Sequence, residues 1–295
     1  MGSGFWFKVR FKVLGALFVA ALLAGCSSDS PTEPSPTPNP TAPVVYTALG
    51  ASDALGIGGS ADCLPFAECP NGTGYVQVIA RTLRSTRTVT LANLGIPAAV
   101  LSPRIQTLGR QYGRFIPANF LDAELPGVAR DSTLVTIFTG ANDANAIGDA
   151  VEQGAGGSNV AAFIDDQIRQ FAAEYRQLIT GVRSRAGQPR IVVANLPNFA
   201  GVPYTTGYPP LRRQAIQTLS VRLTREAINT LTSDGVAVVD LMCDGRSYEP
   251  GRYSADGFHP NDAGYAFLAE LMLRAINDAG FPAPQNDCSF MRIVS

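Results

Sequence analysis

The sequence predicts an α/β fold in which helices cover both faces of a parallel sheet. Short runs of β-forming residues alternate with longer segments of helical periodicity, which is typical of βαβ units. Each short run is almost continuously apolar, as expected of a strand that is covered on both faces. The five expected strands span 44–49, 88–92, 133–139, 190–195 and 236–241.

The helices are predicted from apolar periodicity and from start and stop signals. Between 158 and 185, apolar residues recur at steps of three and four and define one helical face. The last helix is expected to begin at Pro260, since proline suits a first helical position, and to run to about Asp278 before Gly280 stops it. Further helices are expected over 73–85, 103–112 and 211–233.

The first residues of this chain of 295 do not belong to the predicted fold. A basic flank precedes the apolar run 13–24, which is typical of a secretory signal and short for a membrane span. The following Leu-Ala-Gly-Cys resembles the lipobox of bacterial lipoproteins, in which the cysteine, here Cys26, is lipidated after cleavage. We therefore expect a signal peptide over 1–25 and an exported protein lipid-anchored to the bacterial envelope, at the outer membrane. An uncut signal anchor is the alternative.

The next segment, 26–43, is rich in Ser, Thr and Pro and has no aliphatic run. Such a segment buries little apolar surface, so we expect an extended tether. The folded domain is then expected over 44–295, and its roughly 250 residues suit a single α/β domain.

Charge and lysine content exclude several classes of function. Removal of the predicted signal leaves 20 basic against 24 acidic residues, a net charge of −4. No basic stripe remains, so nucleic acid is not an expected partner. Lys8 and Lys12 are the only lysines, which excludes a Schiff base, a phosphate-loop lysine and a Ser-Lys dyad from the predicted domain.

Four cysteines lie in the predicted domain: Cys63, Cys69, Cys243 and Cys288. An even number in an exported protein favours disulfides. A metal site would need short paired spacings and several histidines, which the chain lacks, so we expect no metal. Of the three possible pairings, Cys63–Cys69 with Cys243–Cys288 is the most economical, because it closes one short loop and ties down the C-terminal tail.

The single histidine, His259, decides which chemistry is open to the chain. Any imidazole base must be this residue, and Asp256 lies three positions before it, close enough to orient its ring. Such a pair is what nucleophilic catalysis by a serine requires. Ser52 follows the first expected strand, while Gly95 and Asn142 follow the second and third, where open α/β sheets place their sites. A backbone N–H and a side-chain amide there suit an oxyanion.

The blocks LGASDALG, NLGIP, GAND and DGFHPND resemble, in this order, the successive motifs of SGNH (GDSL-type) hydrolases over nearly the whole domain. That family has a three-layer α/β/α sandwich with a mostly parallel five-stranded sheet, similar to flavodoxin. The resemblance implies Ser52 as nucleophile, with Asp256 and His259 as orienting acid and general base. It also implies an oxyanion hole made by the backbone N–H groups of Ser52 and Gly95 and the side chain of Asn142.

Two positions depart from the family pattern. Ala51 replaces the usual Asp before the nucleophile, and Ala54 stands where Ser or Thr is common. Because that Asp is not the triad acid, we expect the machinery to be retained and the support of the nucleophile turn to differ. The insertion 58–72 follows the nucleophile and is expected to shape one wall of the cleft.

The resemblance implies a monomeric, cofactor-free carboxylic ester hydrolase, an esterase or lipase acting through an acyl-Ser52 intermediate. The aromatic segment 196–210, with Tyr248, Tyr253 and Phe258, suits a lipid, an aryl ester or an acetylated glycan equally. The alternatives are a polysaccharide acetylesterase with the same machinery and an inactive binding lipoprotein. The α/β-hydrolase fold is disfavoured because no serine lies in a Gly-x-Ser-x-Gly elbow.

Overall fold

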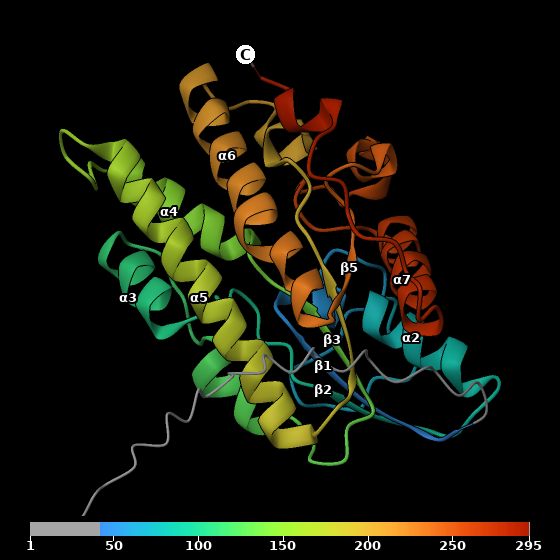
Figure 1. The fold of residues 1–295 in the computed structure, drawn as a ribbon. Coiled ribbons are helices and arrows are strands. Elements are labelled where there is room, and N and C mark those ends of the chain that lie inside the picture. The colour runs from blue at the N-terminus through green and yellow to red at the C-terminus, as the bar shows by residue number, and fades with distance from the viewer. Residues whose placement is uncertain (1–41, 295) are drawn as a thin grey trace, which may run out of the picture. The chain divides into compact units, whose positions relative to one another are not determined.

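The computed structural model of the protein describes residues 42–294 (Figure 1). The predicted signal peptide, Cys26 and nearly all of the tether lie outside these described residues. Within them, five parallel strands in the order β2-β1-β3-β4-β5 form one sheet with helices on both faces. The predicted three-layer α/β/α fold with a parallel five-stranded sheet is confirmed.

All five predicted strands are present, with bounds shifted by one or two residues. Four of them are largely buried, as expected from their apolar sequences, but β2 is only partly buried along its length. The prediction that both of its faces are covered is therefore wrong. As an edge strand, β2 pairs only with β1 and leaves its other flank open. The strands are β1 (Val44–Gly50), β2 (Val89–Asn93), β3 (Leu134–Phe138), β4 (Arg190–Ala194) and β5 (Ala237–Val239).

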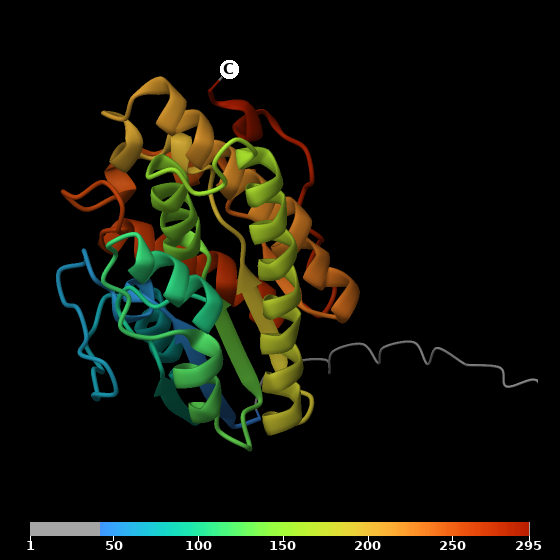
Figure 2. The ribbon, with the colours of Figure 1, turned by 90° about the vertical axis from the view of Figure 1, so that its left-hand side faces the viewer.

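The helices divide between the two faces of the sheet. One face carries α2 (Tyr75–Arg84) and α7 (Asp262–Asn277), which lie on the right in Figure 1. The other face is turned toward the viewer in Figure 2, where the long α5 crosses in front of the strands. Its helices are α3 (Pro103–Gln111), α4 (Ala141–Glu152), α5 (Val160–Ala186) and α6 (Pro210–Leu223).

The predicted helix over 211–233 is helical throughout, but only its first part, α6, is α-helical. A π-helical turn (Thr224–Ile228) and a 3-10 segment (Asn229–Asp234) follow it. Gly235 ends this stretch in the left-handed conformation, with a φ of 71°, which glycine adopts without a steric penalty.

Two helix predictions are corrected. Helix α4 is absent from the predicted set, because its alanine- and glycine-rich sequence has few large apolar residues to show periodicity. Pro260 does not begin α7, because Asn261 caps that helix by accepting hydrogen bonds from the N–H groups of Ala263 and Gly264. The end of the helix at Asn277 agrees with the predicted end near Asp278, with Gly280 following it.

Two disulfides join the cysteines in the predicted pairing, Cys63–Cys69 and Cys243–Cys288. The first closes a loop within the insertion 58–72, and the second fixes the C-terminal segment next to the end of β5. Between residues 42 and 294, no helix combines the length and the apolar character that crossing a membrane requires.

Candidate active site

Ser52 lies in a tight turn between a buried strand and a short helix. Strand β1 ends at Gly50, and Ser52 is the first residue of α1 (Ser52–Leu55). A Cβ atom at Gly50 would lie 2.6 Å from the Cβ of Ala54, so only glycine lets the chain turn back this closely. Because Ser52 opens the helix, its own N–H has no intrahelical acceptor and is available to a negatively charged oxygen.

The three predicted triad residues meet although they come from opposite ends of the domain. The Nε2 atom of His259 lies 2.8 Å from the Oγ of Ser52. On the other side of the ring, Nδ1 lies 2.6 Å from the Oδ2 of Asp256. A proton can therefore pass from the hydroxyl to the imidazole, while the carboxylate fixes the ring orientation.

Asp256 is held in its charged form by a cluster of donors. Its Oδ1 accepts hydrogen bonds from the Ser254 hydroxyl at 2.8 Å and from the backbone N–H groups of Phe258 and His259 at 2.8 and 2.9 Å. Partial burial raises the pKa of Asp256, but the His259 ring and these three donors outweigh it and lower the pKa to about 2. The carboxylate therefore stays ionised at every pH at which a serine hydrolase works.

The predicted oxyanion donors lie beside the nucleophile turn. Asn142 is in the first turn of α4 and uses one amide hydrogen to bond the carbonyl of Ala99 at 2.9 Å, which leaves the second for a ligand. Gly95 packs directly on α1, since a Cβ there would lie 2.9 Å from the Cβ of Ala54. Its N–H donates to the side chain of Asn93 at 3.2 Å, a long bond that a developing oxyanion can compete with.

Two polar residues that the sequence reasoning did not assign hold these loops in place. Asn93 donates to the carbonyl of Ala54 at 2.7 Å and so connects the Gly95 turn to α1, which carries Ser52. Asp143, next to Asn142, accepts the N–H of Leu101 at 2.9 Å, and its complete burial raises its pKa to about 7. Both residues stand inside the NLG and GAND motifs, and this position in the sequence could have indicated their role.

Glu124 binds the turn that carries Ser52. Its side chain is fully buried, and Oε2 accepts the backbone N–H of Gly50 at 2.9 Å. Burial raises its pKa well above the usual range, against the opposing effect of that hydrogen bond. The turn thus has a carboxyl beside it although Ala51 lacks one, and nothing in the local sequence around Glu124 marks this role.

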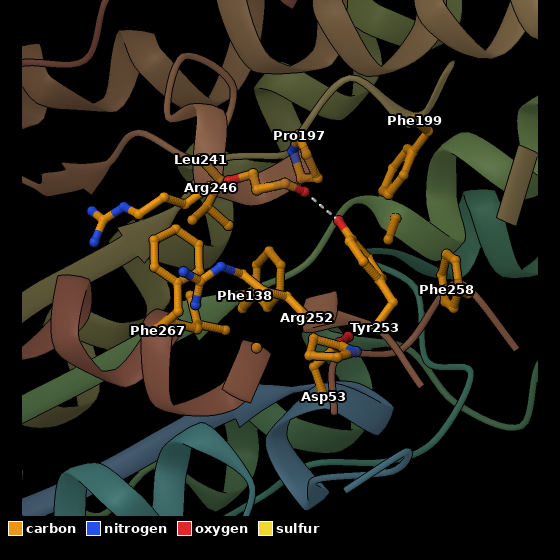
Figure 3. Close-up of a pocket in the computed structure, with 15 residues that line it drawn as sticks. Asp53, Phe138, Pro197, Phe199, Leu241, Arg246, Arg252, Tyr253, Phe258 and Phe267 are labelled. Carbon is orange, nitrogen blue, oxygen red and sulfur yellow. Dashed lines mark hydrogen bonds between the residues drawn. The ribbon is translucent and has the colours of Figure 1, made fainter. Parts of the chain in front are cut away.

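An apolar cavity of about 70 Å³ opens next to this site, at the carboxyl ends of β3, β4 and β5 (Figure 3). Asp53, Phe138 and Ala141 line both this cavity and a smaller one that reaches Asn142, so the apolar space adjoins the candidate oxyanion site. In Figure 3 the aromatic rings converge on the same space. Among the lining residues are Phe138, Phe199, Leu241, Tyr253, Phe258 and Phe267.

The predicted aromatic lining is correct in part. Tyr253 and Phe258 line the cavity, whereas Tyr248 stacks on Phe290 with 4.6 Å between ring centres and donates to the carbonyl of Met242. Tyr248 therefore packs the C-terminal segment and takes no part in lining the cavity.

The insertion 58–72 lies against the histidine loop. Ser60 donates through both its N–H and its hydroxyl to Asp262, at 2.8 and 2.6 Å. A Cβ at Gly58 would lie 2.8 Å from the Cβ of His259, so this segment packs closely behind the imidazole.

The fold and this arrangement define a Ser-His-Asp site at the carboxyl edge of a parallel sheet. The family model of the GDSL-like lipases and acylhydrolases matches residues 46–267, and the chain belongs to this family.

Several solved structures share the fold. They include a lipase from a goat rumen metagenome (18% identity, 83% of this chain and 100% of that chain, TM-score 0.51). A phospholipase A1 from Streptomyces albidoflavus is 18% identical, and the match covers 79% of this chain and 100% of that chain with a TM-score of 0.54. An acetyl xylan esterase from Geobacillus stearothermophilus is 16% identical, and the match covers 81% of this chain and 95% of that chain with a TM-score of 0.51. No curated protein matches the chain significantly. At these identities the likeness concerns the fold alone.

Proposed function

We propose that the protein is a carboxylic ester hydrolase that works by two-step acyl transfer through an acyl-Ser52 intermediate. The observation that carries the proposal is the continuous chain of contacts from Ser52 Oγ through both ring nitrogens of His259 to Asp256. A structural histidine needs no serine hydroxyl at one nitrogen and an ionised carboxylate at the other, whereas a nucleophilic serine needs both.

In the first step, His259 Nε2 takes the Ser52 proton while Oγ attacks the ester carbonyl carbon. The resulting oxyanion accepts hydrogen bonds from the N–H groups of Ser52 and Gly95 and from the Asn142 amide. The imidazolium then protonates the leaving alcohol, and Asp256 stabilises its positive charge. In the second step, His259 takes a proton from water, whose oxygen attacks the acyl carbonyl carbon. The imidazolium then returns the proton to Ser52 Oγ as the bond between Oγ and the acyl carbon breaks and the acid leaves.

The test is hydrolysis of p-nitrophenyl esters by the wild-type protein and by Ser52→Ala and His259→Ala variants. Each variant should lose at least about three orders of magnitude in kcat/KM. A fluorophosphonate probe should label the wild-type protein at Ser52. Wild-type-like turnover by the Ser52→Ala variant would overturn the assignment, and an unlabelled, inactive wild-type protein would favour a binding protein on a hydrolase fold.

We also propose that the mature protein is attached to the bacterial envelope by a lipid on Cys26, because the Leu-Ala-Gly-Cys sequence follows a short apolar run. Growth of expressing cells with a radioactive fatty acid should label the protein, and Cys26→Ala should abolish the label. Label that survives the substitution would contradict this attachment site.

A further inference from the structure

A second and larger cavity, of about 300 Å³, lies between α4 and the segment 208–216 at the start of α6. Its lining is amphipathic. The apolar part comes from Val151, Tyr208, Pro209, Leu211 and Ile216, and the polar part from Asn145, Asp149, Glu152 and Arg212. This size falls within the range of small-molecule sites in proteins.

Asn145 is the residue that marks this cavity as a binding site. The residue is only 9% exposed and its amide makes no hydrogen bond within residues 42–294, yet the amide atoms are still accessible from the cavity. The amide is therefore free to donate and accept hydrogen bonds there. An unpaired amide that lines a cavity is therefore placed to bind a polar group that enters it.

The helix that carries Asn145 also links the cavity to the reaction centre. Asn142, the candidate oxyanion donor, lies one turn earlier on α4, and Asp149 and Glu152 follow on the same face. At 1.5 Å per residue, this face extends about 15 Å from Asn142 to Glu152. A ligand held here can thus be continuous with an ester at Ser52.

A row of aromatic rings forms a second connection, on the histidine side. Phe258 lies 5.0 Å from the ring of His259, Tyr204 lies 5.1 Å from Phe258, and Tyr208 lies 5.4 Å from Tyr204. The guanidinium of Arg212 covers Tyr208 at 4.1 Å from the ring centre. The row therefore leads from the general base to the wall of the larger cavity.

The two cavities suit the two halves of an ester. The apolar cavity offers about 70 Å³ and the amphipathic one about 300 Å³. A short acyl group fits the first. The second has room for a sugar ring, whose apolar face packs on tyrosine while its hydroxyls bond amide, carboxylate and guanidinium groups. An alkyl chain there would leave the Asn145 amide buried and unpaired, which is unfavourable.

We propose that the cavity between α4 and α6 binds a hydroxyl-rich ring of the alcohol part, so that the substrate is a glycan carrying short O-acyl groups. This inference rests on the proposed ester hydrolysis at Ser52 and adds a site for the leaving group. Asn145 and Tyr208 act there as specificity residues that contact the sugar.

The test compares acetylated xylo-oligosaccharides with p-nitrophenyl acetate and p-nitrophenyl palmitate. In Asn145→Leu and Tyr208→Ala variants, the ratio of kcat/KM for the glycan to that for the aryl acetate should fall about tenfold, mainly through KM. Phe115→Ala, which removes an 85% exposed ring outside both cavities, should leave the ratio unchanged. The aryl acetate rate shows in each variant that the protein is folded.

An unchanged ratio in both cavity variants would overturn the proposal. So would a selective loss on the palmitate, because the cavity would then hold an acyl chain. If the wild-type protein hydrolysed none of the esters, the proposed hydrolysis itself would fail. Calorimetric titration with unacetylated xylohexaose separates the two cases, since binding that is weakened by Tyr208→Ala supports the sugar site whatever the activity, and no binding counts against it.

Discussion

Replacement of Asp256 by Asn should abolish most activity by reversing the tautomer of His259. One carboxylate oxygen, Oδ1, accepts three hydrogen bonds from Ser254 and from two backbone N–H groups. In the Asp256→Asn variant, the carbonyl oxygen of the new amide must occupy that position, because an NH₂ group there would face three donors. The NH₂ group is then forced to face His259 Nδ1, which must become an acceptor.

The neutral imidazole of that variant carries its proton on Nε2, the atom 2.8 Å from Ser52 Oγ, and cannot accept the serine proton. We expect kcat to fall about 10⁴-fold, which corresponds to about 5 kcal/mol of transition-state stabilisation. The rate of p-nitrophenyl acetate hydrolysis measures this loss.

Ser254→Ala is the matched control, because it removes one donor to Asp256 and leaves the tautomer unchanged. Its kcat should stay within about tenfold of the wild-type value. Since the pKa of Asp256 is about 2, protonation of this carboxylate should not contribute to any loss of the wild-type rate above about pH 3. Retention of more than a tenth of the activity by Asp256→Asn would refute the reasoning.

Three further changes test the scaffold of the site. Replacing Cys243 and Cys288 by Ala should lower the free energy of unfolding in urea by roughly 4 kcal/mol, because the disulfide spans 45 residues; no change would contradict this. Gly95→Ala should reduce kcat about a hundredfold, since the new Cβ displaces the turn from Ala54; a wild-type kcat would show that the turn yields. Folded Asp143, with a pKa of about 7, binds more protons than the unfolded chain between about pH 4 and 7, so wild-type stability falls as pH rises through this window. The Asp143→Asn variant should lose this contribution to the pH dependence. Parallel plots of unfolding free energy against pH for the wild-type and variant proteins would refute the prediction.

Local patterns were sufficient to predict most of the fold. The five strands are short apolar runs. A strand in a covered parallel sheet can be recognised from such a run alone, because both of its faces are buried. Helix α4 was missed because it contains few large apolar residues, so its sequence shows no helical periodicity. It packs against α3 and α6 in the structure. The partial exposure of β2 was missed because it depends on which elements cover that edge of the sheet, since β5 at the other edge is buried throughout.

The site divides in the same way. The contacts that join Ser52, His259 and Asp256 agree with the prediction from sequence, because each of these residues is in a short motif of the family pattern. Glu124 was not predicted, because it reaches the turn that carries Ser52 from 74 positions away through one hydrogen bond to Gly50.

The sequence by itself limited the chemistry open to the chain, since one histidine and no lysine in the domain leave His259 as the one imidazole or amine base that the proposed mechanism can use. Tertiary structure alone decided where the substrate has room. The small apolar cavity, the larger one with the unpaired Asn145 and the row of rings from His259 to Tyr208 are all made by side chains from separate elements. A cavity is the space that packing leaves unfilled, and no short stretch of sequence records it.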